Sequence, residues 1–289
     1  SIPCVRMAPG AFTTVLLGLW ITSRAVRPSR EDFGQLQGTE VAPPDDLQIR
    51  EAGAAFLQGG SESAGYPHCD GLPRNGSHVI DTARILSSSC TWHGHPGLQV
   101  ALKKPISFQG SLILMGEIQI TAVQELDGPC FMVFGSMTVM SANASFVGCR
   151  STWQGESEAF LGKGGGLFIE RDFMVSHSDV KFQSCRAPRG GGLYTRGFSQ
   201  EASTVTFENC TAARNGGGAH VENSFRQGPN SSAIFRSCRA GQDGGGLHVS
   251  GSYQQEALSS VHFEHCLADS DGGGAHVGKN FTQGPNSSA

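Results

Sequence analysis

The sequence predicts an all-β parallel β-helix, a solenoid whose coils of 26 to 28 residues stack along one axis. Three observations predict it: one motif recurs at near-constant spacing, its strands are short and alternate apolar with polar residues, and the segments between them lack helical periodicity. Glycine supplies 40 of the 289 residues and charged residues only 16%. Such a composition excludes a coiled coil and a charge-rich disordered chain.

The repeated motif combines Phe-x-x-Cys with a run of three glycines. Successive glycine runs are 26, 26, 28 and 28 residues apart, and residues 276–289 repeat residues 220–233 at 10 of 14 positions. Leucine-rich repeats have a similar period, but their leucine frame is absent. The Phe-x-x-Cys units are Phe146–Cys149, Phe182–Cys185, Phe207–Cys210, Phe235–Cys238 and Phe263–Cys266, and the glycine runs begin at Gly164, Gly190, Gly216, Gly244 and Gly272.

The alternation assigns side chains to the inside or the outside of the coil. Before each cysteine, residues such as Val205 and Phe207 are expected to point inward; after each glycine run, Leu247 and Val249 are expected inside and His248 outside. Stacked coils should therefore place Phe over Phe in a continuous core that no single coil could bury alone. The glycines are expected to form bends with positive φ, since a phosphate-binding loop needs another glycine spacing and a following helix.

Composition divides the rest of the chain. Residues 1–25 are interpreted as a signal peptide, with basic Arg6, an apolar run over residues 11–22 and a small-x-small cleavage site over residues 23–25. Residues 26–75 are expected to be a flexible leader, and residues 76–130 an N-terminal cap with irregular first coils. Residues 131–289 are expected to form the β-helix repeats, truncated at the C-terminus because the sequence stops inside a unit.

Export implies a secreted or cell-surface protein in an oxidising compartment. Eight cysteines lie beyond the signal, so disulfides are allowed. Asn-x-Ser/Thr triplets, the acceptor sites of N-glycosylation, occur at six positions. These are Asn75, Asn143, Asn209, Asn230, Asn280 and Asn286, of which Asn230 and Asn286 lie in Gly-Pro-Asn-Ser-Ser turns.

Over residues 130–289 the Gly-Gly-Gly-Leu/Ala run with Phe-x-x-Cys resembles the repeat of the chlamydial-type polymorphic outer membrane proteins. The wider superfamily is pectin-lyase-like. The resemblance implies a right-handed parallel β-helix and a secreted surface adhesin. The present chain has Cys where the family's Phe-x-x-Asn motif has Asn, and adhesion is implied by analogy.

The cysteine column has two interpretations. Because residues 25 or 28 positions apart lie in neighbouring coils, Cys185–Cys210 and Cys238–Cys266 are candidate disulfides. A ladder of buried free thiols is the equal alternative, since side chains in register often point past one another.

Two further columns carry groups that could bind a metal. His220, His248 and His276 should form an outward column able to hold a transition metal, although stacking without a ligand is the preferred interpretation. Asp243 and Asp271 precede glycine runs one coil apart and could share a calcium ion, although a turn role is preferred. No cofactor and no catalytic residue is assigned.

The expected function is therefore structural or adhesive, with loops such as residues 225–232 presented to an extracellular protein or glycan. The alternative is a polysaccharide-active lyase or glycoside hydrolase whose catalytic coils are degenerate or missing from this sequence; three or more Asp, Glu or Arg lining an outward groove would favour it. A net charge of −4 gives no signal for nucleic acid. Membrane attachment stays open.

Overall fold

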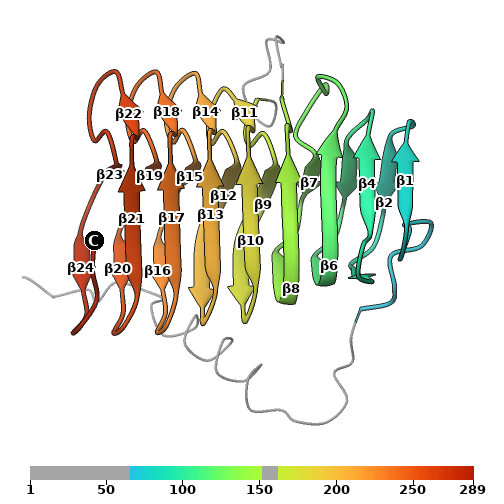
Figure 1. Cartoon of the computed structure of the whole chain (residues 1–289), viewed down its shortest axis with the longest axis horizontal. Coiled ribbons are helices and arrows are strands. Elements are labelled where there is room, and N and C mark those ends of the chain that lie inside the picture. Colours follow the sequence, from blue (N-terminus) through green and yellow to red (C-terminus); the bar gives the residue numbers. More distant parts are fainter. Residues whose placement is uncertain (1–65, 152–161) are drawn as a thin grey trace, which may run out of the picture. The chain divides into compact units, whose positions relative to one another are not determined.

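A computed structural model describes residues 66–151 and 162–289, which are all strands and turns with no helix (Figure 1). The predicted signal peptide and residues 26–65 of the leader lie outside the described residues. The strands stack in parallel as a β-solenoid of about eight turns, as the repeat predicts.

Each turn contributes to three parallel ladders. Ladder 1 contains the strands that precede the Cys positions, ladder 2 those that follow the glycine runs, and ladder 3 those that lead back to ladder 1. Four long strands turn a corner and belong to two ladders each: β6 (Leu112–Ala122), β8 (Met137–Val147), β9 (Leu167–Ser176) and β12 (Leu193–Glu201).

Ladder 1 consists of β1 (Ser77–Ile80), β4 (Gln99–Leu102), β6 (Leu112–Ala122), β8 (Met137–Val147), β10 (Asp179–Gln183), β13 (Thr204–Glu208), β17 (Ser232–Arg236) and β21 (Ser260–Glu264). Ladder 2 consists of β2 (Arg84–Leu86), β5 (Ile106–Phe108), β7 (Phe131–Val133), β9 (Leu167–Ser176), β12 (Leu193–Glu201), β15 (Ala219–Val221), β19 (Leu247–Val249) and β23 (Ala275–Val277). Ladder 3 consists of β3 (Cys90–Gly94), parts of β6, β8, β9 and β12, then β16 (Phe225–Gln227), β20 (Tyr253–Gln255) and β24 (Phe281–Gln283). A separate sheet of two-residue strands contains β11 (Arg186–Ala187), β14 (Thr211–Ala212), β18 (Arg239–Ala240) and β22 (Leu267–Ala268).

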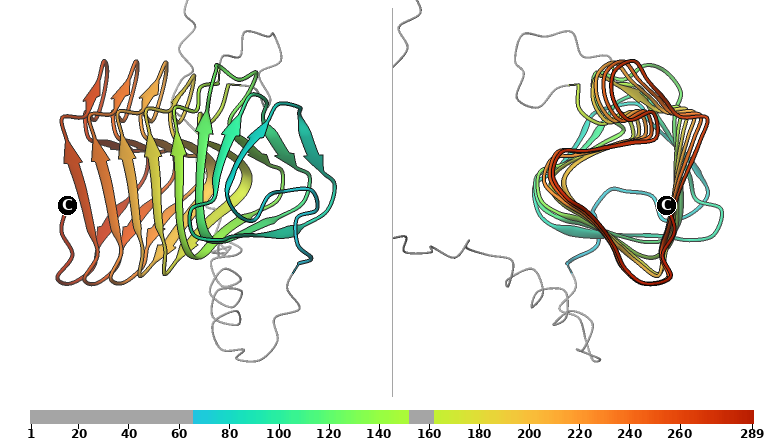
Figure 2. Two further views of the ribbon diagram at one scale, coloured as in Figure 1. Left: turned by 45° about the vertical axis from the view of Figure 1, so that its right-hand side comes forward. Right: turned by 90° about the vertical axis from the view of Figure 1, so that its left-hand side faces the viewer.

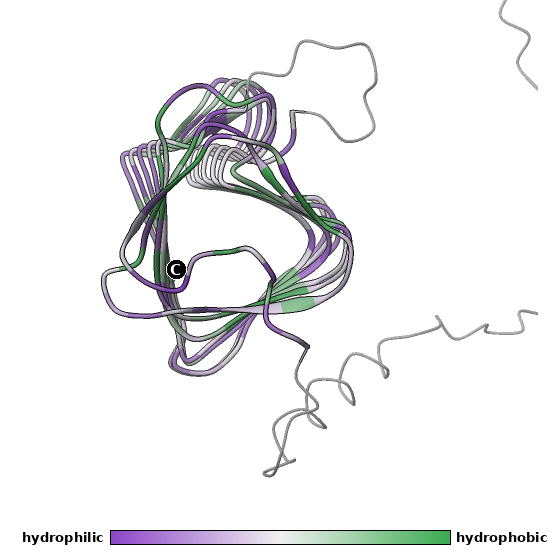
Figure 3. Ribbon diagram, turned by 90° about the vertical axis from the view of Figure 1, so that its right-hand side faces the viewer, coloured by the Kyte–Doolittle hydropathy of each residue, from purple (hydrophilic) through white to green (hydrophobic). Residues whose placement is uncertain are grey.

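The core is built from columns of like side chains, as predicted. Phe207 pairs in register with Phe182 on one side and Phe235 on the other, and its ring centroid lies 4.8 and 4.9 Å from theirs. Phe235 continues the column to Phe263 at 5.1 Å. Seen along the axis, successive coils overlie one another, with their apolar stretches in line (Figures 2 and 3). The hydrophobic core therefore runs the length of the solenoid.

The glycine runs make the bends that the sequence predicts. Gly216 has φ of 70°, a conformation that other residues rarely adopt. A Cβ atom on Gly217 would lie 2.1 Å from the carbonyl oxygen of Gly245 in the next coil. The first glycine thus serves the backbone turn, while the second lets two coils approach.

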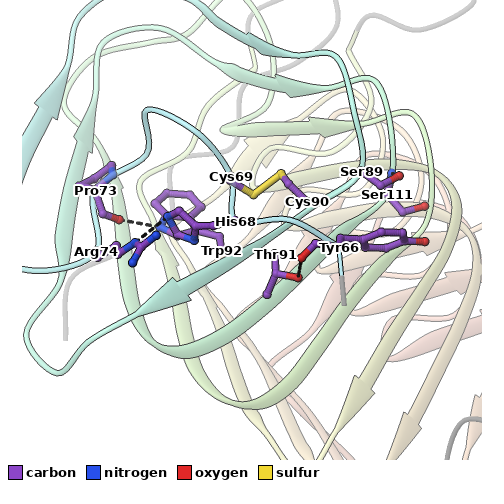
Figure 4. The surroundings of a disulfide bond; sticks show 10 residues. All are labelled: Tyr66, His68, Cys69, Pro73, Arg74, Ser89, Cys90, Thr91, Trp92 and Ser111. Atoms are coloured by element: carbon purple, nitrogen blue, oxygen red, sulfur yellow. Dashed lines mark hydrogen bonds between the residues drawn. A yellow bond between two sulfur atoms is a disulfide. The ribbon is translucent and has the colours of Figure 1, made fainter. Parts of the chain in front are cut away.

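Regular stacking begins earlier than the repeat motif. Ser77 pairs with Gln99, and Gln99 with Gln119, so the first coils contain 22 and 20 residues and lack the Cys-turn-glycine segment. Residues 66–76 precede this first coil and are fastened to it by the Cys69–Cys90 disulfide and by the Trp92 indole, which donates a 2.7 Å hydrogen bond to the Pro73 carbonyl (Figure 4). Shorter coils thus occupy most of residues 76–130, for which we expected a cap together with irregular first coils.

Candidate functional site

The outward side chains of ladder 2 form one column of stacked rings. The ring centroids of Tyr194 and His220 are 4.9 Å apart, those of His220 and His248 4.6 Å, and those of His248 and His276 5.0 Å. Adjacent planes in this series differ by at most 7°. Phe168 extends the column beyond Tyr194. We refer to these five side chains as the ring column.

The ring column points away from the core, as expected, but most of its rings are covered by their neighbours. His220 is only 6% exposed and His248 7%, and Phe168 and Tyr194 are also buried. Each ring covers the faces of its neighbours, and Tyr194, His220 and His248 line an open groove of about 560 Å³ that Arg189, Asn215 and Glu222 also line. The rings therefore present edges, not faces, to the groove.

Burial keeps the imidazoles of the groove uncharged. Desolvation lowers the pKa of His220 to about 3, and the positive charges of His248, Arg189 and Lys163 act in the same direction. Desolvation also lowers the pKa of His248, with His276 adding to the effect and Asp243 opposing it. The Nδ1 atoms of His220 and His248 are buried without a hydrogen-bond partner in the described part of the chain.

One end of the groove carries basic groups. The ammonium of Lys163 lies 4.6 Å from the centre of the Tyr194 ring and 3.6 Å from a carboxylate oxygen of Glu222. The Tyr194 hydroxyl donates a hydrogen bond to the same carboxylate. Burial, followed by this hydrogen bond, raises the pKa of Tyr194. The Glu222 carboxylate is thereby held in place by two neighbours.

The His276 end of the ring column, beyond the lining of the groove, brings together residues that the sequence suggested as two separate candidates. One ligand atom each from Asp243, Asp271 and His276 lie within 4.8 Å of one another. The Asn215 amide donates to Asp243 Oδ2 at 3.3 Å, and the backbone N–H of Asp271 donates to Asp243 Oδ1 at 3.2 Å. The acidic column and the ring column therefore meet, although each was predicted from its own spacing.

The cysteine column contains free thiols, not the candidate disulfides. Cys185, Cys210, Cys238 and Cys266 are unpaired, so neither Cys185–Cys210 nor Cys238–Cys266 is formed. Their thiols instead donate to backbone carbonyls of the coil below; Cys210 Sγ, for example, lies 3.6 Å from Phe182 O. Burial raises the pKa of the Cys210 thiol well above its usual value.

The disulfides form elsewhere. Cys69 pairs with Cys90, and Cys130 with Cys149. Cys149 belongs to the Phe-x-x-Cys column, but Cys130 comes from the segment before β7, where no repeat predicts a partner.

All six of the sequon asparagines are exposed. They are Asn75, Asn143, Asn209, Asn230, Asn280 and Asn286. Asn230 and Asn286 have positive φ values of 54° and 56°, at the same corner two coils apart. Between residues 225 and 232, however, Phe225, Gln227 and Ser231 are buried. That segment is a tight corner rather than a projecting loop.

Comparisons with protein-family models, with curated proteins and with solved structures found no match for this chain. Within the described ranges, no helix is long and apolar enough to cross a membrane.

Proposed function

We propose that this chain is a secreted or cell-surface β-solenoid with a structural or adhesive role, which binds an extracellular protein or glycan through its outer faces and has no catalysis of its own. A relationship to the polymorphic outer membrane protein repeats is part of this proposal and rests on the repeat motif alone.

The observation that carries the proposal is the outward face of ladder 1. Its strands pair in register, so that outward residues of successive coils form straight rows. Ion pairs link these rows between coils: Lys181 and Glu208 are 2.7 Å apart, and Arg236 and Glu264 are 3.2 Å apart. Exposed pairs of this kind add little stability, so they serve mainly to define a polar surface. Rows at regular intervals suit an extended partner.

Two features support export. The Cys69–Cys90 and Cys130–Cys149 disulfides need an oxidising compartment. The exposed sequon asparagines are accessible to glycosylation enzymes.

The groove beside the ring column favours the rival function, a polysaccharide-active enzyme. Arg189 and Glu222 line it, and Asp243 and Asp271 lie near His276 at the end of the ring column. Glycoside hydrolysis needs two free carboxyl groups flanking the bond to be cleaved. Here Glu222 is bound by Lys163 and Tyr194, and Asp243 is hydrogen-bonded to Asn215. Because the Glu222 and Asp243 carboxylates are already bound by these neighbours, we propose adhesion rather than catalysis as the function.

The test is secretion of the chain, with residues 1–25 retained, from a eukaryotic host. We expect processed protein in the medium that binds saturably to an array of immobilised glycans and extracellular proteins. Reversing a charge of the ladder 1 face with Lys181→Glu should weaken that binding, while the matched change Lys104→Glu, far along the solenoid, should not. Retention in the cytosol, or conversion of polygalacturonate or another polysaccharide into shorter products, would overturn the proposal.

A further inference from the structure

Asp243, Asp271 and His276 gather at the His276 end of the ring column. Asp243 and His276 are half-buried and Asp271 is exposed, and one ligand atom from each lies within 4.8 Å of the other two. We propose that these three side chains form a binding site for a divalent transition-metal ion of the zinc class.

The fold places the three groups together. Asp243 and Asp271 stand in equivalent positions, because Gly244 N–H donates to the Asp271 carbonyl and the glycine bends that follow are stacked. The bend after Asp271 leads the chain into β23. His276, which is five residues after Asp271, therefore lies beside the Asp271 carboxylate. His276 is held in plane by His248, whose ring is 5.0 Å away and 2° from parallel.

The residue just before each glycine run changes its charge along the solenoid, and the ring-column side chain that follows the run changes with it. Lys163 and Arg189 occupy this position in the coils whose rings are Phe168 and Tyr194. Asn215 occupies it in the coil whose ring is His220, and Asp243 and Asp271 occupy it in the coils whose rings are His248 and His276. Acidic groups therefore stand beside two of the three imidazoles and beside neither Phe168 nor Tyr194.

The two carboxylates lack a cationic partner. In the part of the chain that the structure describes, neither Asp243 nor Asp271 lies within salt-bridge distance of a lysine, arginine or histidine side chain, and their contacts are with the Asn215 amide and a backbone N–H. Two negative groups one coil apart repel each other, and a divalent cation would relieve that repulsion.

A buried imidazole supplies an independent observation. His248 is only 7% exposed and stacks directly on His276. Its Nδ1 has no hydrogen-bond partner among the described residues. His248 would thus serve as a neighbouring donor or as support for His276.

The ligand set selects the ion. One imidazole with two carboxylates suits zinc and its neighbours in the first transition row, whereas calcium prefers oxygen ligands only. Metal–ligand bonds of about 2.0–2.2 Å require the three ligand atoms to move closer together. Rotation of the exposed Asp271 side chain can bring its carboxylate closer to the other two. Three protein ligands leave a fourth position open to water or to a group from a partner.

The test is titration of the intact chain with Zn²⁺ by calorimetry and with Co²⁺ by visible absorption. We expect one saturable site, with the intense d–d bands of tetrahedral cobalt. Asp271→Asn and His276→Gln should each weaken binding by more than the roughly tenfold loss caused by a missing outer-shell partner. The matched controls are Asp269→Asn, which removes an exposed carboxylate paired with Arg239, and His262→Gln, which removes an exposed imidazole of ladder 1.

These controls should bind as the parent chain does. Non-saturable uptake, equal loss in the controls, or binding that persists in both Asp271→Asn and His276→Gln would overturn the proposal. Calcium binding that survives His276→Gln would also overturn it, because an oxygen-only site does not need the imidazole.

Discussion

Phe207 lies directly over Phe235, with ring centroids 4.9 Å apart and planes 4° from parallel. The two residues are 28 positions apart in the sequence and are register partners in ladder 1. Each ring is fully buried, and each contributes to the core of two coils at once.

Removing one ring from this column should destabilise the whole solenoid. Phe207→Ala deletes a buried ring between Phe182 and Phe235, and we expect a loss of about 3–5 kcal/mol in the free energy of unfolding. Thr206→Ala, the adjacent and partly exposed position, should change it by less than about 0.5 kcal/mol. Urea unfolding followed by circular dichroism measures both. Similar midpoints for the two variants would argue against the column.

The glycine bends should not tolerate a methyl group. Gly217→Ala would place Cβ 2.1 Å from the Gly245 carbonyl oxygen, so the two coils must separate. We expect a clear drop in melting temperature or loss of soluble protein. Gly128→Ala is the control, because its nearest neighbour would be the Met132 sulfur at 3.7 Å. Equal melting temperatures in the two variants would contradict the close approach of the coils.

Acid should weaken the fold through the ring column. The pKa of His220 is about 3 in the folded chain and 6.5 when unfolded, so below pH 6.5 the unfolded chain binds more protons and stability falls as pH decreases. We expect the His220 imidazole alone to lower the free energy of unfolding by about 2 kcal/mol between pH 7 and pH 5. His220→Phe, which copies Phe168 in the same column, should remove that part of the pH dependence.

The measurement is the urea midpoint at the two pH values. His262→Phe, at an exposed position, should leave the pH dependence as it is in the parent chain. An unaltered pH dependence in His220→Phe would show that the imidazole is not held neutral by burial.

The cysteine column should resist alkylation until the chain unfolds. Burial raises the pKa of Cys210, so native protein should react slowly with iodoacetamide. Denatured, unreduced protein should gain label at Cys185, Cys210, Cys238 and Cys266, and peptide mapping should recover the Cys69–Cys90 and Cys130–Cys149 pairs. A cross-linked Cys185–Cys210 peptide would restore the disulfide interpretation.

The repeat made the core predictable. Constant spacing identified Phe207, Phe235 and Phe263 as one column, and the alternation around them gave the inward side chains. An apolar side chain that recurs once in every coil is stable only in the stacked core, so its sequence spacing is enough to locate it.

The outer groove was less predictable. The alternation of apolar and polar residues predicts that His248 points away from the core. Its burial, however, depends on the rings above and below it and on side chains from the flanking turns. The meeting of Asp271 with His276 depends on the path of the glycine bend. The Cys130–Cys149 pair was missed because the segment that supplies Cys130 lacks the motif.

Residues one period apart in this chain lie over one another, and a crystal structure is the strongest test of that stacking. We expect the rings of Phe207, Phe235 and Phe263 to form a single row with centroids about 5 Å apart, at the strand spacing of a parallel sheet. Rings found in separate parts of the molecule would contradict it.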